Sequence, residues 1–186
     1  RIVGAHTDSP NLRVKPRPDV VRAGVHQIGV EAYGGVLLNS WLGRDLGLSG
    51  RVAVRRNGTG ALVRLLRVDR PVCAIPQLAI HLDRDVSTRG LVVDAQHHLT
   101  PLWALSEGGF AGFVAKVLGV GGDDVLGWDL MLHDLAAGAL VGRDDELLGS
   151  ARLDNRASCW GAVEALASAA PAGAGPIPGV CLFDHE

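Results

Sequence analysis

The sequence is poor in cysteine and in aromatic residues, and both scarcities exclude classes of protein. Its 186 residues include 3 Cys, 4 Trp, 3 Phe and 1 Tyr. The widely spaced Cys73, Cys159 and Cys181 do not form the even-numbered framework of a disulfide-rich domain, and no Cys-x-x-Cys motif indicates a cysteine metal site. Cys73 and Cys181 are expected to be small core residues. A reducing, cytoplasmic location is therefore expected.

Long apolar runs and several common catalytic motifs are also missing. No run approaches the ~18 consecutive apolar residues of a transmembrane helix, so no membrane span or membrane partner is expected. The sequence has no Gly-x-Ser-x-Gly elbow of a serine hydrolase. It also lacks the glycine-rich loops that bind nucleotides. What it does have, 47% hydrophobic residues with 25 Gly and 9 Pro, is typical of a globular protein of one domain or two small ones.

Positive charge is concentrated in the first half of the chain. Residues 1–89 hold 14 Lys and Arg against 7 Asp and Glu, whereas residues 90–186 hold 4 against 13. The arginines of the basic half are dispersed, and almost no aromatic side chains accompany them on which bases could stack. No nucleic-acid partner is therefore expected, and the asymmetry indicates solvated faces or two regions that attract each other.

Metal-binding residue types follow two short apolar runs at opposite ends of the chain. Residues 2–5 form the first run, which His6 and Asp8 follow; residues 180–183 form the second, which ends three residues before Glu186. Runs this short fit buried strands better than helices. Open α/β sheets bind ligands beyond the carboxyl ends of their strands. If the two strands are neighbours, these three polar side chains converge and predict a metal site.

A third cluster at Asp154 completes this hypothesis. Two metals held close together need a bridging carboxylate, and Asp154 stands at the predicted start of an Ala-rich helix, where anions are favoured. His6 would be a ligand, Asp8 would accept from its other ring N–H, and Glu186 would be the general base toward an activated water. Structural alternatives remain open: a loop histidine, an Asx turn at Asp8, a helix N-cap at Asp154 and a chain end at Glu186.

The residues between these clusters indicate mostly β-structure. Strands are predicted at 12–16, 25–30, 50–56, 61–68 and 128–132. Within 33–38, the glycine pair Gly34-Gly35 is expected to form a tight turn with positive φ, and a further strand is expected to follow it. Pro16 and Pro18 are expected to end the first of these strands, and Asn57-Gly58 to form a hairpin turn. Apolar residues at helical spacing predict a helix at 110–118 that Gly119 ends. Within residues 11–82, turn signals about every ten residues favour a small β-sandwich or barrel.

The predicted organisation is discontinuous. The outer segments, 1–10 and 148–186, have the pattern of an α/β domain, and residues 11–147 form a separate, mostly β insertion between them. Loops of α/β sheets accept such insertions when the inserted ends lie close together.

Seven motifs run from one end of the chain to the other: GAHTDSP (4–10), LRVKP (12–16), VEAYGG (30–35), RDL (44–46), IPQLAIHL (75–82), RLDNR (152–156) and FDHE (183–186). In this order they resemble those of the aspartyl aminopeptidases, the M18 family of zinc metallopeptidases. The resemblance implies an α/β catalytic domain, present here in part and interrupted by a β-rich dimerisation domain. It also implies two zinc ions, replaceable by cobalt or manganese, peptide substrates with acidic N-termini, and self-association into dimers or larger assemblies.

The resemblance also implies roles for individual residues. His6 matches a zinc ligand, Asp8 the carboxylate that orients it, Asp154 the bridging ligand and Glu186 the general base. His81, in the inserted domain, matches a histidine that reaches across a dimer interface into the neighbour's active site.

Two departures from the family pattern bear on activity. Gly43 stands where the family commonly has Asp, which is expected to alter a local turn or interface. The family's remaining zinc ligands and most residues that recognise the acidic side chain follow the position of Glu186, so this chain is expected to hold part of the site. Three hypotheses result: a zinc aminopeptidase chain whose activity needs those later residues, an inactive homologue that serves as an interaction module, and an aminopeptidase of another specificity.

Overall fold

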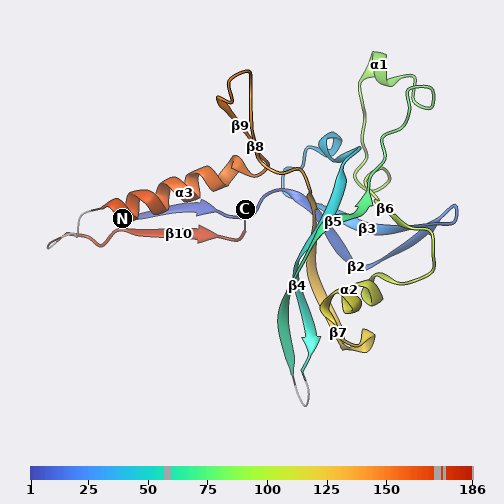
Figure 1. Cartoon of the computed structure of the whole chain (residues 1–186), viewed down its shortest axis with the longest axis horizontal. Coiled ribbons are helices and arrows are strands. Elements are labelled where there is room, and N and C mark those ends of the chain that lie inside the picture. The colour runs from blue at the N-terminus through green and yellow to red at the C-terminus, as the bar shows by residue number, and fades with distance from the viewer. Residues whose placement is uncertain (57–59, 170–172, 174, 186) are drawn as a thin grey trace. The chain divides into compact units, whose positions relative to one another are not determined.

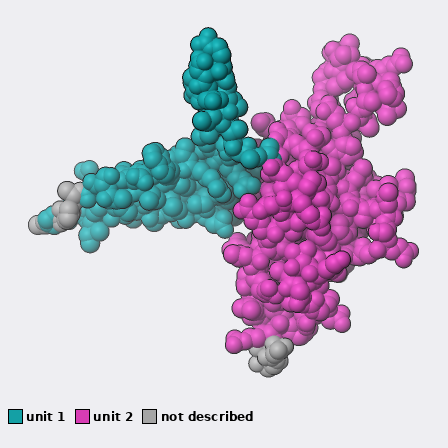
Figure 2. Space-filling model, in the orientation of Figure 1, with its two compact units in different colours: residues 1–10, 136–186 teal, residues 11–135 magenta. Residues whose placement is uncertain are grey.

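The computed structural model describes residues 1–56, 60–169, 173 and 175–185, and it divides into two compact units. Unit 1 comprises residues 1–10 and 136–186, and unit 2 comprises residues 11–135 (Figure 2). The predicted insertion, residues 11–147, begins at the same residue as unit 2 but ends later, because unit 2 ends at residue 135. The predicted Asn57-Gly58 turn lies outside the described residues.

Unit 2 is a closed β-barrel, one of the two architectures that the sequence predicts. Its strands follow the order β2-β3-β6-β5-β4-β7, with β7 returning to β2, and all of these neighbours are antiparallel (Figure 1). The strands are β2 (Asn11–Arg22), β3 (Val25–Tyr33), β4 (Asp45–Arg55), β5 (Ala61–Ala74), β6 (Leu102–Ala104) and β7 (Val125–Asp134).

The barrel core comes from the alternation of side chains along these strands. Residues two apart lie on one face of a strand, so every second side chain points inward. The inward apolar side chains include Leu12, Val14, Ile28, Val30, Leu46, Leu48, Val52, Val54, Leu66, Leu130 and Leu132, all buried. The strand predicted at 128–132 is thus confirmed as part of β7.

Strand β2 continues through Pro16 and Pro18, so the prediction that these prolines end it is wrong. The register between β2 and β3 shifts between Val14 and Asp19, which marks an irregularity of the bulge type. Both prolines lie in this irregular stretch. Because the ladder is interrupted there, their missing N–H groups cost no regular hydrogen bond.

The tight turn predicted at Gly34-Gly35 is confirmed, but the strand predicted after it does not form. After Tyr33, Gly34 takes a φ of 73° and its carbonyl accepts from the N–H of Val36 at 2.9 Å, so the chain turns tightly. A 3₁₀ helix, η1 (Leu38–Trp41), follows. Gly43 has a φ of 72° and donates its N–H to the carbonyl of Ile75 at 2.7 Å. This position therefore has the left-handed conformation that favours glycine.

The predicted helix at 110–118 is confirmed as α2 (Phe110–Leu118), which ends at Gly119 in the left-handed conformation. Phe110, Val114 and Leu118 of this helix join the barrel core. The N–H of Phe110 donates to the carboxylate of Asp19 at 2.8 Å, so β2 satisfies a helix-end donor. The short 3₁₀ helix η2 (Gly122–Asp124) then leads into β7.

A long excursion, residues 76–101, connects β5 to β6. It contains α1 (Val86–Arg89) and turns, and Figure 1 shows it extending away from the barrel. Its apolar side chains Leu78, Ile80 and Leu82 are all exposed. None of the helices in the described part of the chain is long and apolar enough to cross a membrane.

Unit 1 is built on two parallel strands, β1 (Ile2–His6) and β10 (Gly179–Phe183). Helix α3 (Leu153–Ser168) packs on this pair, and a separate hairpin joins β8 (Ala139–Val141) to β9 (Leu147–Gly149). Among the described residues of this unit, only Ala5 and Cys159 are buried. The mixed α/β class is thus observed in unit 1 as a small parallel sheet with one helix.

Candidate metal centre

The centre is formed at the carboxyl end of β1, where the strand has β10 as its neighbour. The parallel register pairs His6 with Phe183, and both the N–H and the hydroxyl of Thr7 donate to the carbonyl of Phe183, at 2.7 and 3.1 Å. Gly4 leaves room for the Phe183 ring, since a Cβ on Gly4 would contact that ring at 3.4 Å. The two strands are neighbours, as the predicted convergence of their polar residues requires. Glu186 itself lies outside the described residues.

The imidazole of His6 faces a different acidic residue with each nitrogen. Nδ1 lies 3.1 Å from the backbone oxygen of Asp8 and 3.4 Å from its carboxylate, and Nε2 lies 3.6 Å from the carboxylate of Asp154. The acceptors around Nδ1 favour the tautomer with its proton there, which leaves the Nε2 lone pair for a metal. The structure therefore brings His6, Asp8 and Asp154 together.

Asp154 lies where the chain enters the regular part of α3. Its φ and ψ are −83° and 114°, those of Asn155 are −116° and 25°, and the peptide bond between them is cis. Regular helical geometry therefore begins after Asn155. The Asp154 side chain is 94% exposed, whereas that of Asp8 is 11% exposed. One carboxylate is thus accessible to a ligand, and the other is enclosed beside the histidine ring.

The distance between His6 Nε2 and Asp154 Oδ1 suits two ligands of one zinc ion. Ligands about 2.1 Å from a tetrahedral zinc lie about 3.4 Å from each other. The observed separation of 3.6 Å between His6 Nε2 and Asp154 Oδ1 is close to that value. Within the described part of the chain, no group of three or more His, Cys, Asp or Glu is arranged to hold a metal. Among the described residues, His6 and Asp154 are thus two candidate donors, one fewer than the three protein ligands of a catalytic zinc site.

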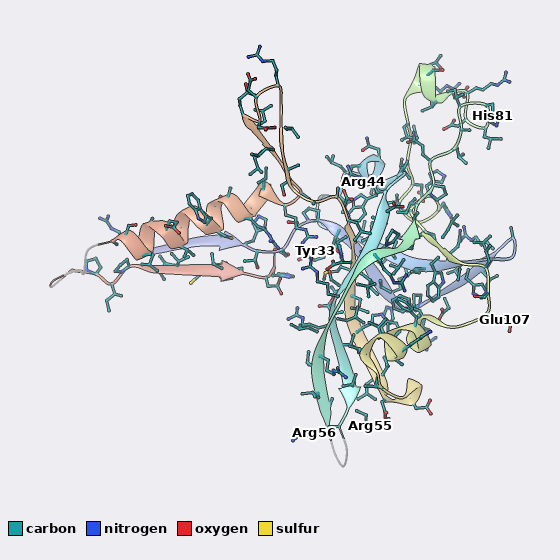
Figure 3. The ribbon with its side chains drawn as sticks, in the orientation of Figure 1. Tyr33, Arg44, Arg55, Arg56, His81 and Glu107 are labelled. Carbon is teal, nitrogen blue, oxygen red and sulfur yellow. The ribbon has the colours of Figure 1, made fainter. Side chains whose placement is uncertain are left out.

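His81 belongs to unit 2. It lies in an exposed turn of the excursion, and Figure 3 shows it near α1, at the outer end of that segment. The base of the excursion is attached to the barrel by Gln96, which donates to Glu31 at 2.7 Å and accepts from Lys15 at 3.1 Å. Lys15 also pairs with Glu31 at 2.9 Å. These hydrogen bonds, from Lys15 first and then Gln96, lower the pKa of Glu31 below its usual value.

A local turn around Asp94 lies two residues before Gln96. The carboxylate of Asp94 accepts the backbone N–H groups of His97 and Gln96 at 2.8 and 2.9 Å. These bonds, His97 first, lower the pKa of Asp94. The Asp94 bonds therefore hold a local turn within the excursion, and Gln96 in that turn is the residue that attaches it to the barrel through charge-assisted hydrogen bonds to Glu31 and Lys15.

Two residues outside the predicted site form hydrogen bonds to the backbone of His6 and Asp154. The thiol of Cys159 donates to the backbone carbonyl of His6 at 3.1 Å, and the hydroxyl of Ser9 donates to the backbone carbonyl of Asp154 at 3.3 Å. Ser9 lies within the GAHTDSP motif, but its partner is 145 positions away in the sequence. No local pattern indicates such a pairing.

A histidine oriented by one carboxylate and faced by another, at the carboxyl end of a parallel sheet, is an arrangement typical of metalloenzyme sites. The family model described as "Aminopeptidase I zinc metalloprotease (M18)" matches residues 1–186. The chain therefore belongs to the M18 family of metallopeptidases.

Relatives and solved structures agree with this assignment. The "Probable M18 family aminopeptidase 2" of Streptomyces avermitilis is 53% identical over 192 residues, which cover 100% of this chain and 44% of the relative. A structure of Chaetomium thermophilum mApe1 is 28% identical with a TM-score of 0.81, over 98% of this chain and 45% of that one. The S. cerevisiae mApe1 dodecamer is 26% identical with a TM-score of 0.76, over 98% and 42%. The chain thus spans less than half the length of the relatives it matches.

Proposed function

We propose that the protein, at the length of its relatives, is a two-zinc aminopeptidase that releases acidic N-terminal residues from peptides. The observation that carries this proposal is the His6 ring, held by Asp8 on one side and 3.6 Å from the Asp154 carboxylate on the other. Family membership supports the peptidase activity. The preference for Asp and Glu rests on the resemblance of the motifs to aspartyl aminopeptidases.

The chain's own residues have distinct tasks in this proposal. Asp8 keeps the His6 proton on Nδ1, so that Nε2 stays a ligand. Asp154, with two carboxylate oxygens and an exposed side chain, would be the residue that holds both cations together with His6. Glu186 would accept the proton of the attacking water. Bound zinc, for which cobalt or manganese can substitute, would supply a Lewis acid and a lowered pKa of water.

Self-association is part of the proposal. A relative of similar fold is described as a dodecamer, and exposed apolar side chains on the excursion surround His81. We assign His81 to the active site of a neighbouring subunit. A cytoplasmic location is proposed as well, supported by the three free thiols of Cys73, Cys159 and Cys181.

A panel of aminoacyl anilides tests the specificity of the protein at its relatives' length. Zinc-loaded protein should release Asp and Glu much faster than Leu, Ala or Lys. Fast release of Leu or Ala with none of Asp or Glu would replace the acidic specificity with another. No release of any residue, from protein shown to be folded and zinc-loaded, would favour the non-catalytic interaction module.

A further inference from the structure

The backbones of the two candidate ligands are tied to each other's segments. Cys159, on the helix that follows Asp154, donates its thiol to the carbonyl of His6 at 3.1 Å. Ser9, three residues after His6, donates its hydroxyl to the carbonyl of Asp154 at 3.3 Å. The segment of Asp154 therefore holds His6, and the segment of His6 holds Asp154. We call this pair of hydrogen bonds the reciprocal clasp.

The clasp holds the backbone of each candidate ligand, and the backbone limits where the donor atom of the side chain can lie. Short side chains such as His and Asp have two χ angles, so a fixed backbone restricts their donor atoms to a few positions. Cys159 is 8% exposed and is one of the two buried residues among the described positions of unit 1. Its hydrogen bond is therefore shielded from competition with water.

We propose that Ser9 and Cys159 are positioning residues of the metal centre, which set the separation of His6 Nε2 and Asp154 Oδ1 before a metal binds. The inference rests on the proposed function and adds two residues that touch neither metal nor substrate. A metal then binds without first drawing the strand and the helix together. Outer residues that orient ligands in this way typically change metal affinity 10- to 100-fold when they are altered.

The test measures the zinc dissociation constant by chelator competition, in the protein at its relatives' length. Cys159→Ala and Ser9→Ala should each weaken zinc binding on the order of 10-fold. Cys159→Ser keeps a hydroxyl donor and should recover most of the affinity. Cys181→Ala is the matched control, because it removes a thiol from the neighbouring strand β10, and it should bind zinc as the wild type does.

The thermal midpoint of each metal-free variant separates positioning from general packing. If Cys159→Ala binds zinc no more weakly than Cys181→Ala, or if Cys159→Ser fails to recover affinity, Cys159 is a packing residue and the inference is overturned. Should Cys159→Ala not fold, the partly exposed Ser9→Ala and the conservative Cys159→Ser decide the question.

Two ligand variants distinguish failure of the clasp from failure of the proposed function. If His6→Ala and Asp154→Asn leave zinc binding unchanged, the metal centre itself is wrong. If both abolish zinc binding while the Ser9 and Cys159 variants bind like the wild type, only the clasp is wrong.

Discussion

The imidazole of His6 links the residues of the candidate centre, because each of its nitrogens faces a different acidic residue. Asp8 sets the tautomer of the His6 ring, and the Asp154 carboxylate faces Nε2 across the position where a cation would lie. An amide in place of the Asp154 carboxylate could not take this role. A neutral side chain neither balances the charge of two cations nor offers them two equivalent oxygens.

Asp154→Asn is therefore expected to abolish two-metal binding in the protein at its relatives' length. Elemental analysis after gel filtration in zinc-containing buffer measures the metals per chain. Asp144→Asn is the control, because Asp144 lies in the exposed turn between β8 and β9, and it should retain the wild-type metal content. A full metal complement in Asp154→Asn would reject the bridging role.

Glu31 provides a prediction about pH. Its pKa is lowered from 4.5 by the Lys15 and Gln96 hydrogen bonds, so the folded state favours the carboxylate more than the unfolded state does. The resulting stability is present above pH ~4.5 and is lost as the pH falls through the lowered pKa. Because the side chain is 53% exposed, the contribution is small.

In Lys15→Met the pKa of Glu31 should return toward 4.5, as measured by NMR titration of its carboxyl carbon. The acid-induced loss of stability below about pH 4.5 should become shallower in denaturant unfolding. The sequence has one other lysine, Lys116 in α2, and Lys116→Met should leave the Glu31 titration unchanged. An unaltered Glu31 pKa in Lys15→Met would contradict the assignment.

The sequence indicates some of these residues and conceals others for physical reasons. His6 and Asp8 follow a recognisable apolar run, and Asp154 stands at the start of a predicted helix, so their candidacy can be predicted. Ser9 and Cys159 act through single hydrogen bonds to carbonyls that are distant in the sequence, and those depend on how a strand and a helix pack.

At the scale of elements, β4 contains a glycine that the barrel requires. Gly50 has a φ of 145°, and a Cβ there would collide with the backbone oxygen of Asp129 on β7. A Cβ added to Gly127 on β7 would meet no atom within 4 Å. An added methyl group should therefore lower the stability of the barrel more at Gly50 than at Gly127.

Gly50→Ala should lower the free energy of unfolding by about 2–4 kcal/mol, since a backbone collision forces the paired strands apart. Gly127→Ala is the matched control and should change it by less than about 1 kcal/mol in either direction. Urea unfolding followed by circular dichroism measures both. Equal stability of the two variants would show that β4 and β7 tolerate a methyl group at Gly50.

The elements also show where sequence patterns succeed and fail. Helix α2 is predictable because its apolar spacing and Gly119 agree. Pro16 and Pro18 mislead, because a shift of register removes the hydrogen bonds that they would have broken. The closure of β7 onto β2 joins Leu12 to Leu132, a contact between residues 120 positions apart that local periodicity does not contain.

At the scale of the whole molecule, the two units differ in how much they bury. Unit 2 holds the apolar core, whereas only Ala5 and Cys159 are buried among the described residues of unit 1. Burial of apolar surface is the main stabilising contribution to folding. Residues 11–135 alone should therefore unfold cooperatively, with a thermal midpoint close to that of residues 1–186. Circular dichroism melting of both polypeptides checks this, and a non-cooperative transition for residues 11–135 would contradict it.

Subunit exchange tests the proposed role of His81 in a neighbouring active site. His81→Ala and Asp154→Asn should each be inactive alone. In a mixed dimer, the His81→Ala subunit keeps its metal centre and receives His81 from its partner, so a 1:1 mixture should recover about a quarter of wild-type activity. No recovery after demonstrated exchange would place His81 in its own subunit's site, and full activity of His81→Ala alone would place it outside any site.

The pairing of Leu12 with Leu132 places the first and last strands of the barrel side by side. The chain therefore enters and leaves the barrel at neighbouring positions. A short turn from Pro10 to Ala136 could replace the whole barrel, so one deletion or insertion in the gene could remove, add or exchange it. For protein engineering, the same adjacency marks Pro10 and Ala136 as the two cut sites at which another module with neighbouring ends could be grafted.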